Sequence, residues 1–318
     1  DKAGALTANV YYAKLGNPGM QPQWISSNHP LPEALQDSKA VVQGDYLYVI
    51  GGYGTTDVNT VYYAHLNSDG SVDAWQTSSN TLPISINSSG SALVNGNVYI
   101  MGGYNATGYS SSVYTAPLNI DGTVDTWSQV VSNNLPSPRQ STKAVTHNGY
   151  IYVIGGDDFY NGNVDTVLYM KPNTDGTVNE WQTAATNLPQ PVSFASIVVN
   201  GDYVYVAGGY GTNNAYTQLV YYAHINTNGT LDSWLSAPLP GGVDYADSAV
   251  VSNNRIYLIN GRDDTPAVRN KIYSASLNSS TGSIGSWQES STVMPEESCQ
   301  SSATVYKGQL YLLISADG

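Results

Sequence analysis

Tyr48-Val49-Ile50-Gly51-Gly52 begins a unit that recurs along this 318-residue chain and decides its fold. The unit continues with Val61-Tyr62-Tyr63-Ala64, Asp69-Gly70 and Trp75. The six tryptophans mark the recurrence, with spacings of 51, 52, 54, 53 and 53 residues: Trp24, Trp75, Trp127, Trp181, Trp234 and Trp287. A period of about fifty residues that fills a chain indicates an array of similar structural units.

The aromatic-aliphatic run of each unit ends, in four of the copies, in a glycine pair. The copies after Tyr48 begin at Tyr99, Tyr152 and Tyr205, whereas the fifth reads Tyr257-Leu258-Ile259-Asn260-Gly261 and the sixth, from Tyr311, has no glycine. Runs of β-branched and aromatic residues bounded by glycine predict strands. The glycines allow positive φ, or close approach of another backbone, where the strand leaves its sheet.

A tyrosine-rich run such as Val61–Ala64 leads in most units into an Asp-Gly or Asn-Gly turn, the strongest short signal for a hairpin. The tryptophan strand is expected after this turn. A polar stretch then ends in a proline, which excludes a central strand there and marks a long connection: Leu31-Pro32, Leu82-Pro83, Leu135-Pro136, Leu188-Pro189, Leu239-Pro240 and Met294-Pro295. With a small-residue first strand before the glycine-pair strand (Ala40-Val41-Val42 in the first unit), each unit is therefore a four-stranded sheet that needs neighbours on both faces.

The two ends of the sequence each supply half a unit. Val10–Ala13 and Trp24 match the third and fourth strands, and residues 303–305 and 311–313 match the first and second. We expect them to complete one sheet and so to close an all-β, six-bladed β-propeller, a single domain over residues 1–318 without exposed sheet edges. The expected blade bounds are 34–77, 84–129, 137–183, 190–236, 243–289, and 296–314 together with 9–26.

The glycine pair after Tyr-Val-Ile, the tyrosine strand and the spaced tryptophan resemble kelch repeats over nearly the whole chain. The fifth and sixth copies depart from the pattern by losing glycines, and the arginine that many kelch repeats place before the first strand is present only as Arg139. The resemblance implies a six- or seven-bladed propeller. It implies no single activity, since kelch proteins include protein-binding modules, a copper oxidase, a sialic-acid epimerase and surface proteins.

Composition narrows the setting of the protein. Charged residues make up 11% of the chain, the formal net charge is −13, and Lys and Arg together number 11. Phosphate contacts need clustered cations, so we expect no nucleic-acid partner, and without an apolar run of about 18 residues we expect no membrane insertion. The chain starts at Asp1, as a processed or excised chain would. Its lysine-poor, Tyr/Asn/Thr/Ser-rich composition resembles that of secreted and surface proteins, which predicts an extracellular or cell-surface location.

Two sets of loops are expected on one face of the propeller, around the mouth of its central channel: those between the second and third strands, and those between blades. Positions just before the first strand carry a different side chain in each unit, unlike the repeated tryptophans, which favours this face as the binding site. The predicted ligand-binding residues are Tyr53, Tyr104, Tyr109, Arg139, Gln140, Asp157, Asp158, Phe159, Tyr160, Phe194, Tyr210, Tyr216, Tyr245, Arg262 and Asp263. Aromatic faces beside amides and carboxylates suit a glycan or a polar protein surface. The alternative is solvated loops with scattered tyrosines.

Enzymatic readings require particular constellations of residues. A copper site of the galactose-oxidase kind needs clustered histidines, but His65 and His224 share one column of the third strand in opposite blades. A sialic-acid epimerase would pair an arginine such as Arg139 or Arg262 with a carboxylate such as Glu296 or Glu297, and the sequence does not show such a pair.

Cofactor sites are expected to be absent, with one alternative left open. The loop from residue 157 to residue 165 has enough oxygen ligands for calcium, but not the spacing of a calcium motif. Cys299, the only cysteine, excludes an internal disulfide and lacks a histidine placed to serve as its base.

The sequence therefore predicts a non-catalytic propeller of a secreted or surface protein that binds a glycan or a protein at the channel mouth. Two alternatives remain: an epimerase- or lyase-like carbohydrate-active enzyme at the same face, and a structural subunit of a surface assembly. No particular oligomer is predicted.

Overall fold

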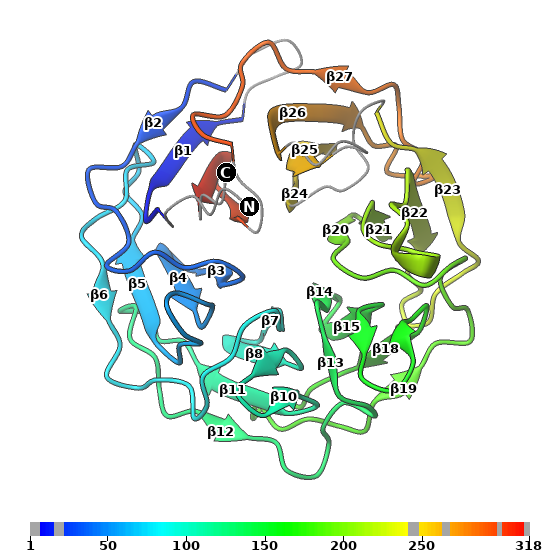
Figure 1. The fold of residues 1–318 in the computed structure, drawn as a ribbon, viewed down its shortest axis with the longest axis horizontal. Helices are drawn as coiled ribbons and strands as arrows, with labels where there is room; N and C mark the ends of the chain where they lie inside the picture. Colours follow the sequence, from blue (N-terminus) through cyan, green and yellow to red (C-terminus); the bar gives the residue numbers. More distant parts are fainter. Residues whose placement is uncertain (1–6, 16–21, 241–247, 263–267, 298–300, 315–318) are drawn as a thin grey trace.

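A computed structural model describes residues 7–15, 22–240, 248–262, 268–297 and 301–314. These residues form four-stranded antiparallel sheets that stand around a common axis, as Figure 1 shows. None of them belongs to a helix long and apolar enough to cross a membrane.

Each sheet runs outward from the axis in chain order, as the repeat predicts. The first three sheets are β3 (Lys39–Gln43), β4 (Tyr46–Ile50), β5 (Val61–His65) and β6 (Gln76–Thr77); β7 (Gly90–Val94), β8 (Asn97–Met101), β11 (Val113–Pro117) and β12 (Ser128–Gln129); and β14 (Lys143–His147), β15 (Tyr150–Ile154), β18 (Val167–Met170) and β19 (Gln182–Thr183). The next two are β20 (Ser196–Asn200), β21 (Tyr203–Ala207), β22 (Leu219–His224) and β23 (Leu235–Pro238); and β24 (Ser248–Ser252), β25 (Arg255–Arg262), β26 (Val268–Ser276) and β27 (Gln288–Glu289).

The remaining four-stranded sheet joins the two ends of the chain. Its order is β2 (Ile25–Ser26), β1 (Val10–Lys14), β29 (Gln309–Leu313) and β28 (Ser302–Tyr306), with Tyr12 directly opposite Tyr311. The prediction that both termini build one sheet is confirmed. The innermost strands also touch in a cycle, from β3 through β7, β14, β20, β24 and β28 back to β3.

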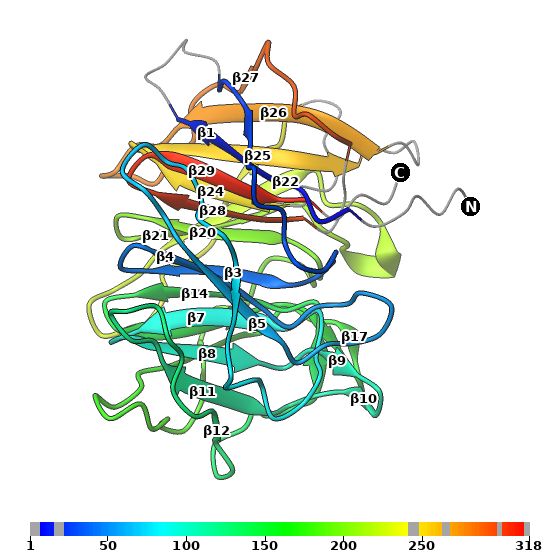
Figure 2. The same cartoon turned by 90° about the vertical axis from the view of Figure 1, so that its left-hand side faces the viewer.

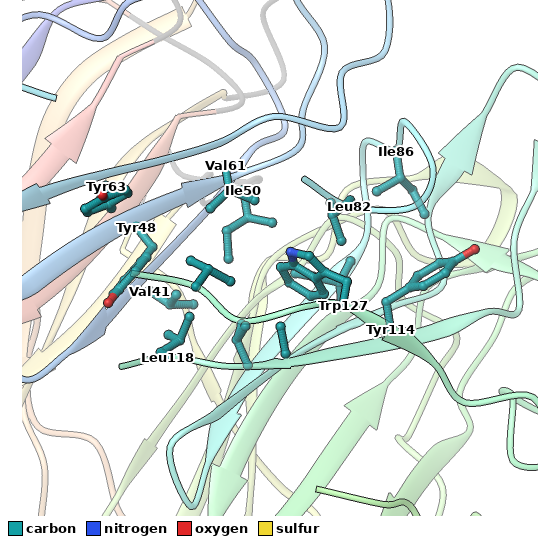
Figure 3. Packing of buried hydrophobic residues seen from close by; sticks show 14 residues of the cluster. Val41, Tyr48, Ile50, Val61, Tyr63, Leu82, Ile86, Tyr114, Leu118 and Trp127 are labelled. Atoms are coloured by element: carbon teal, nitrogen blue, oxygen red, sulfur yellow. The ribbon is translucent and has the colours of Figure 1, made fainter. Parts of the chain in front are cut away.

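Apolar side chains fill the space between neighbouring sheets. One cluster joins Val41, Tyr48 and Ile50 of the first sheet to Ile100 and Trp127 of the next, and Figure 3 shows this packing. Full burial of one such side chain contributes about 1.5–3 kcal/mol, so each sheet is stabilised mainly by its neighbours.

The tryptophans lie just before the outermost strands rather than within them, which corrects the predicted position. Trp127, for example, precedes β12, and its indole nitrogen donates to the Asn80 carbonyl at 3.3 Å. Four other indoles bond backward in the same way: Trp75 to His29, Trp181 to Asn133, Trp234 to Thr186 and Trp287 to Pro238. Each of these five indoles thus links its sheet to the segment that precedes it, whereas the Trp24 indole nitrogen has no hydrogen-bond partner within the described residues.

A buried tyrosine hydroxyl forms a second recurring link between sheets. Tyr152 donates to the Gly229 carbonyl of the next sheet at 3.0 Å, and the pairs Tyr99–Gly176 and Tyr205–Gly282 repeat the bond at the same separation of 77 residues. Gly229 has a φ of 87°, and a Cβ atom there would lie 2.5 Å from the Cε1 atom of Tyr150. The glycine of the Asn-Gly turn is therefore required by both the backbone and the packing.

Candidate functional site

Small ribbons at one end of the inner strands bring the two predicted sets of loops together. The residue after a glycine pair bonds to the residue three positions before the first strand of its sheet, as in Gln36–Tyr53, Asn87–Tyr104 and Ser193–Tyr210. In the third sheet the same ribbon is β13 (Arg139–Gln140), β16 (Asp157–Asp158) and β17 (Gly162–Asn163). Figure 2 shows β9 (Tyr104–Asn105), β10 (Gly108–Tyr109) and β17 on the same side of the molecule, which we call the rim face.

The residue that turns the chain from each ribbon into the inner strand has a left-handed backbone. Its φ is 53° at Asp37, 50° at Ser88, 51° at Ser141 and 54° at Phe194. This conformation costs roughly 1–2 kcal/mol for a residue with a Cβ atom. These four positions share one backbone geometry but carry three kinds of side chain, aspartate, serine and phenylalanine, so their residue types do not signal the turn.

Four aromatic rings form a continuous row across the rim face of the second and third sheets. The ring centres are 5.9 Å apart for Tyr104 and Tyr109, 5.6 Å for Tyr109 and Phe159, and 5.2 Å for Phe159 and Tyr160. Tyr104 is 41% exposed, Phe159 61% and Tyr160 72%. We call these four residues the aromatic row. Their edge-to-face contacts fix the rings relative to one another while leaving large apolar surfaces exposed to water.

A polar network supports the row from beneath. The Tyr109 hydroxyl donates to Asp157 Oδ2 at 2.5 Å, and the Gln140 amide donates to the same carboxylate oxygen at 3.0 Å and to the Tyr109 oxygen at 2.9 Å. Burial, followed by the bond to Asp157, raises the pKa of Tyr109 to about 12. The phenol therefore stays protonated at neutral pH and acts as a donor.

A second aromatic group lies on the ribbon of the fourth sheet. The ring of Phe194 is 5.8 Å from that of Tyr210, which is 5.0 Å from that of Tyr216. Tyr53, on the first ribbon, is 39% exposed. The predicted aromatic residues that the structure describes thus lie in rim-face loops.

Arg139 and Asp158 do not face solvent, unlike the other predicted residues of their loops. The guanidinium is 3.5 Å from the Asp158 carboxylate, and both side chains are buried. Arg139 also donates to Thr166 Oγ1 at 3.1 Å and to Ser137 Oγ at 2.9 Å. Hydrogen bonds, led by that from Ser137, lower the pKa of Asp158 despite its burial. This pair holds β13 against β16, so the assignment of a ligand-binding role to the two side chains is replaced by a structural one.

Three predicted residues lie wholly or partly outside the described structure. Tyr245 and Asp263 are outside the described residues, and Arg262 is described only as the last backbone position of β25, opposite Val268. Cys299 also falls outside.

The Glu296 carboxylate, considered above for an epimerase, bonds to residues at the sheet that joins the two ends of the chain. Glu296 accepts hydrogen bonds from Asn9 at 2.6 Å and from Tyr11 at 2.5 Å, both near the amino-terminal end. Burial and this bond raise the pKa of Tyr11 to about 12. Glu296 therefore ties the N-terminal strand to the loop before the last two strands.

The described residues include no group of three or more His, Cys, Asp or Glu side chains placed to hold a metal ion. The carboxylate of Asp158, considered for calcium, is occupied by Ser137, Arg139 and Asn161. His65 and His224 occupy equivalent strands, and each pairs with an aspartate of its own sheet, at 3.4 and 3.5 Å.

Four-stranded sheets around one axis, with loops gathered on a rim face, define this molecule as a kelch-type β-propeller, a fold typically used for binding and interaction. The chain belongs to the kelch-repeat domain family: the model described as "KLHDC2/KLHL20/DRC7 Kelch-repeats domain" matches residues 2–209.

Individual relatives are distant. The chain is 26% identical to spermatocyte protein spe-26 of Caenorhabditis elegans over 242 residues, covering 75% of this chain and 39% of that protein. It is 24% identical to mouse Kelch domain-containing protein 1 (75% of this chain, 66% of that protein), and 26% identical to Kelch-like protein terF of Aspergillus terreus (87% and 60%). The chain thus spans less than two thirds of each of these proteins. The solved structure described as "Structure of YjhT" superposes with a TM-score of 0.70 at 15% identity, over 90% of this chain and 95% of that one, which shows the shared fold.

Proposed function

We propose that this chain is a non-catalytic binding domain, a closed six-bladed propeller over residues 1–318 with the blade bounds predicted above. Its rim face would dock a glycan or a protein outside the cell or on its surface. The cycle of contacts among the six inner strands supports the blade count. The acidic, lysine-poor composition supports the location and favours neutral or basic partners.

The aromatic row carries the proposal. Tyrosine rings offer large contact areas and lose little conformational entropy on binding, which is why tyrosine is enriched in paratopes and interface hot spots, and phenylalanine adds aromatic contact area. Phe159 and Tyr160 are largely exposed, while Tyr109 beneath them is fixed by Gln140 and Asp157. A rigid, partly apolar platform beside amide and carboxylate groups suits the face of a sugar ring or a polar protein surface.

One observation favours the enzymatic alternative, an epimerase- or lyase-like activity at the same face. Tyr109 and Asp157 form the acid–base contact that such chemistry would need. However, the raised pKa of Tyr109 makes its phenolate scarce at neutral pH, so this phenol is a poor proton acceptor. Binding without catalysis is therefore the stronger proposal.

The test is a screen of the intact protein against a glycan array and a displayed protein library, beside the variant Tyr104→Ala/Phe159→Ala/Tyr160→Ala. A control variant, Ile120→Ala, removes a side chain that is 99% exposed in a turn after β11. We expect saturable binding that the triple variant loses by at least about tenfold, since hot-spot truncations cost about 2 kcal/mol or more. Binding that survives in the triple variant, or that falls equally in the control, would refute the rim-face site. Turnover of a bound saccharide would instead support the enzymatic alternative.

A further inference from the structure

A groove of about 620 Å³ lies between the second and third sheets, and we call it the inter-sheet groove. One wall is the outermost strand β12 with the segment after it, and another is the Asp-Gly turn of the third sheet, residues 175–178. Asn97 and Pro117, which are paired across β8 and β11, also line it. This pair lies at the opposite end of β8 from the glycine pair that leads to the rim face, so the groove is separate from the aromatic row.

Hydrogen bonds hold the two walls of the groove in place. The Tyr99 hydroxyl of the second sheet donates to the Gly176 carbonyl of the turn at 3.2 Å. The Asn133 side chain, in the segment after β12, donates to the Val178 carbonyl at 2.7 Å. A site whose walls are fixed before binding loses less conformational entropy when a ligand enters it.

The wall formed by β12 is more apolar than the same part of the other repeats. Val130 and Val131 occupy the third and fourth positions after Trp127, and both line the groove. Val131 is 79% exposed. In the other five repeats the same two positions hold Ser27-Asn28, Ser78-Ser79, Ala184-Ala185, Ala237-Pro238 and Ser290-Ser291. Because five repeats fold without these valines, the pair points to a task of this groove rather than to a need of the sheet.

Carboxylates line the same groove. Asp175 lies on the turn and Asp125 lies before β12, and both are exposed. Thr177 donates to Asp175 Oδ1 through its hydroxyl at 2.6 Å and its amide at 2.9 Å, and these bonds lower the pKa of the Asp175 carboxyl, which is therefore charged at neutral pH. The net charge of −13 attracts cationic ligands from a distance as well. Valines beside carboxylates favour a ligand that is both apolar and positively charged.

The outermost strand adds main-chain hydrogen-bonding groups. The Val130 amide donates to the Val113 carbonyl at 2.8 Å, so Gln129, one position earlier, forms a non-hydrogen-bonded pair with Tyr114. The N–H and C=O groups of Gln129 therefore point away from β11. They lie at the outer edge of the molecule, where no other strand of the described residues pairs with β12 (Figure 1). A peptide laid along such an edge gains main-chain bonds as well as side-chain contacts.

We propose that the inter-sheet groove binds an extended peptide segment that carries lysine or arginine next to valine, isoleucine or leucine. The apolar side chain packs on Val130 and Val131, the cation lies near Asp125 and Asp175, and the peptide backbone pairs with the outer edge of β12. This site does not depend on the proposed rim-face function.

Two libraries of biotin-labelled hexapeptides test the proposal by biolayer interferometry at neutral pH. In the first library a lysine or arginine lies between two positions drawn from valine, isoleucine and leucine. In the second library glutamate replaces the cation and everything else is the same. We expect members of the basic library to bind saturably at one site per chain, and members of the acidic library not to bind.

Two variants remove the two kinds of contact, each with a matched control. Val131→Ser introduces the residue that the first and fifth repeats carry at this position, and its control is Leu235→Ser, which removes a 54% exposed side chain from β23. Asp175→Asn removes the charge, and its control is Asp121→Asn in the equivalent turn of the second sheet. Asn228 occupies this turn position in the fourth sheet with the same hydrogen bonds, so both asparagine variants keep the turn.

Binding of the basic peptides should weaken about tenfold in V131S, as expected for the lost burial of one valine, and about two- to fivefold in D175N, because the ion pair is partly exposed. L235S, D121N and the rim-face variant Tyr104→Ala/Phe159→Ala/Tyr160→Ala should bind as the wild type does, and thermal melting checks that every variant is folded. Absence of saturable binding by the wild type would overturn the proposal. Equal affinities of V131S and L235S, or of D175N and D121N, or a loss confined to the rim-face variant, would do so as well.

Discussion

Replacing Tyr152 with Phe isolates the hydrogen bond that links one sheet to the next. The ring is fully buried and stacks on Tyr169 with centres 6.0 Å apart, so Phe keeps the packing. The hydroxyl donates to the buried Gly229 carbonyl at 3.0 Å, and its loss leaves that carbonyl without this donor. The expected cost is about 1–3 kcal/mol.

The chain contains its own matched control. Tyr48 occupies the same column, is equally buried and stacks on Tyr63 at 6.2 Å, but its hydroxyl has no partner within the described residues. Tyr48→Phe removes an unsatisfied polar group, so its expected effect ranges from none to a stabilisation of about 1 kcal/mol. The two variants remove the same atom, and only their hydrogen bonding differs.

Urea unfolding at neutral pH, followed by tryptophan fluorescence and far-UV circular dichroism, measures both changes. Coincidence of the two signals supports the two-state treatment from which the free energies are taken. We expect Y152F to be less stable than Y48F by at least about 1 kcal/mol. Equal stabilities would refute the idea that this bond, rather than ring packing alone, holds neighbouring sheets together.

Three further predictions concern stability. Arg139→Met should lower the free energy of unfolding by about 3–5 kcal/mol, because the Asp158 carboxylate then stays buried without a cation. A loss below about 1 kcal/mol in urea unfolding would contradict this prediction. Gly229→Ala should lower the melting temperature more than Gly162→Ala does. Both glycines have positive φ, but of the two only Gly229 faces a ring, that of Tyr150. Equal losses would argue against this contact. Burial raises tyrosine pKa values in the fold, and it raises the pKa of Tyr311 from its ordinary value of 10.0 to about 12. The contribution of such a group to stability should be complete below about pH 10 and should be lost as the pH rises toward 12, and unfolding titrations without this decline would contradict the prediction.

Much of the fold is predictable from the sequence because each repeat position has one structural task. The glycine pairs, the Asp-Gly turns and the tyrosine runs mark strand ends and faces that every sheet needs. The pairing of Val10 with Leu313 follows from the same register, carried around to the chain ends. The sequence predicts the tryptophans within the outermost strands, whereas the structure has them just before these strands. Sequence spacing does not reveal that an indole reaches a neighbouring segment.

The rim face was only partly predictable. The loops and their aromatic residues could be assigned from position, but contacts between loops could not. Ser88 and Phe194 have left-handed backbones without being glycine or asparagine, because tertiary pairing imposes the turn. Arg139 looked like a ligand-binding cation, and only the folded ribbon shows that Asp158 and Thr166 enclose it.

The claim that both ends of the chain close one ring is tested most directly by a crosslink between β1 and β29. Lys14 lies opposite Gln309, and the bond from the Leu15 amide to the Gly308 carbonyl makes the neighbouring pair the hydrogen-bonded one. Lys14 and Gln309 are therefore a non-hydrogen-bonded pair, whose Cα atoms approach within the range that a disulfide needs.

The measurement is intact-mass and peptide mass spectrometry of Lys14→Cys/Gln309→Cys after mild oxidation, in a Cys299→Ser background. Lys14→Cys/Lys171→Cys, which places the second thiol next to β18 in another sheet, is the control. A closed ring predicts near-complete intramolecular crosslinking of the first variant, a higher melting temperature on oxidation, and no intramolecular crosslink in the control. Free thiols in the first variant, or equal crosslinking in both, would contradict closure by the two termini.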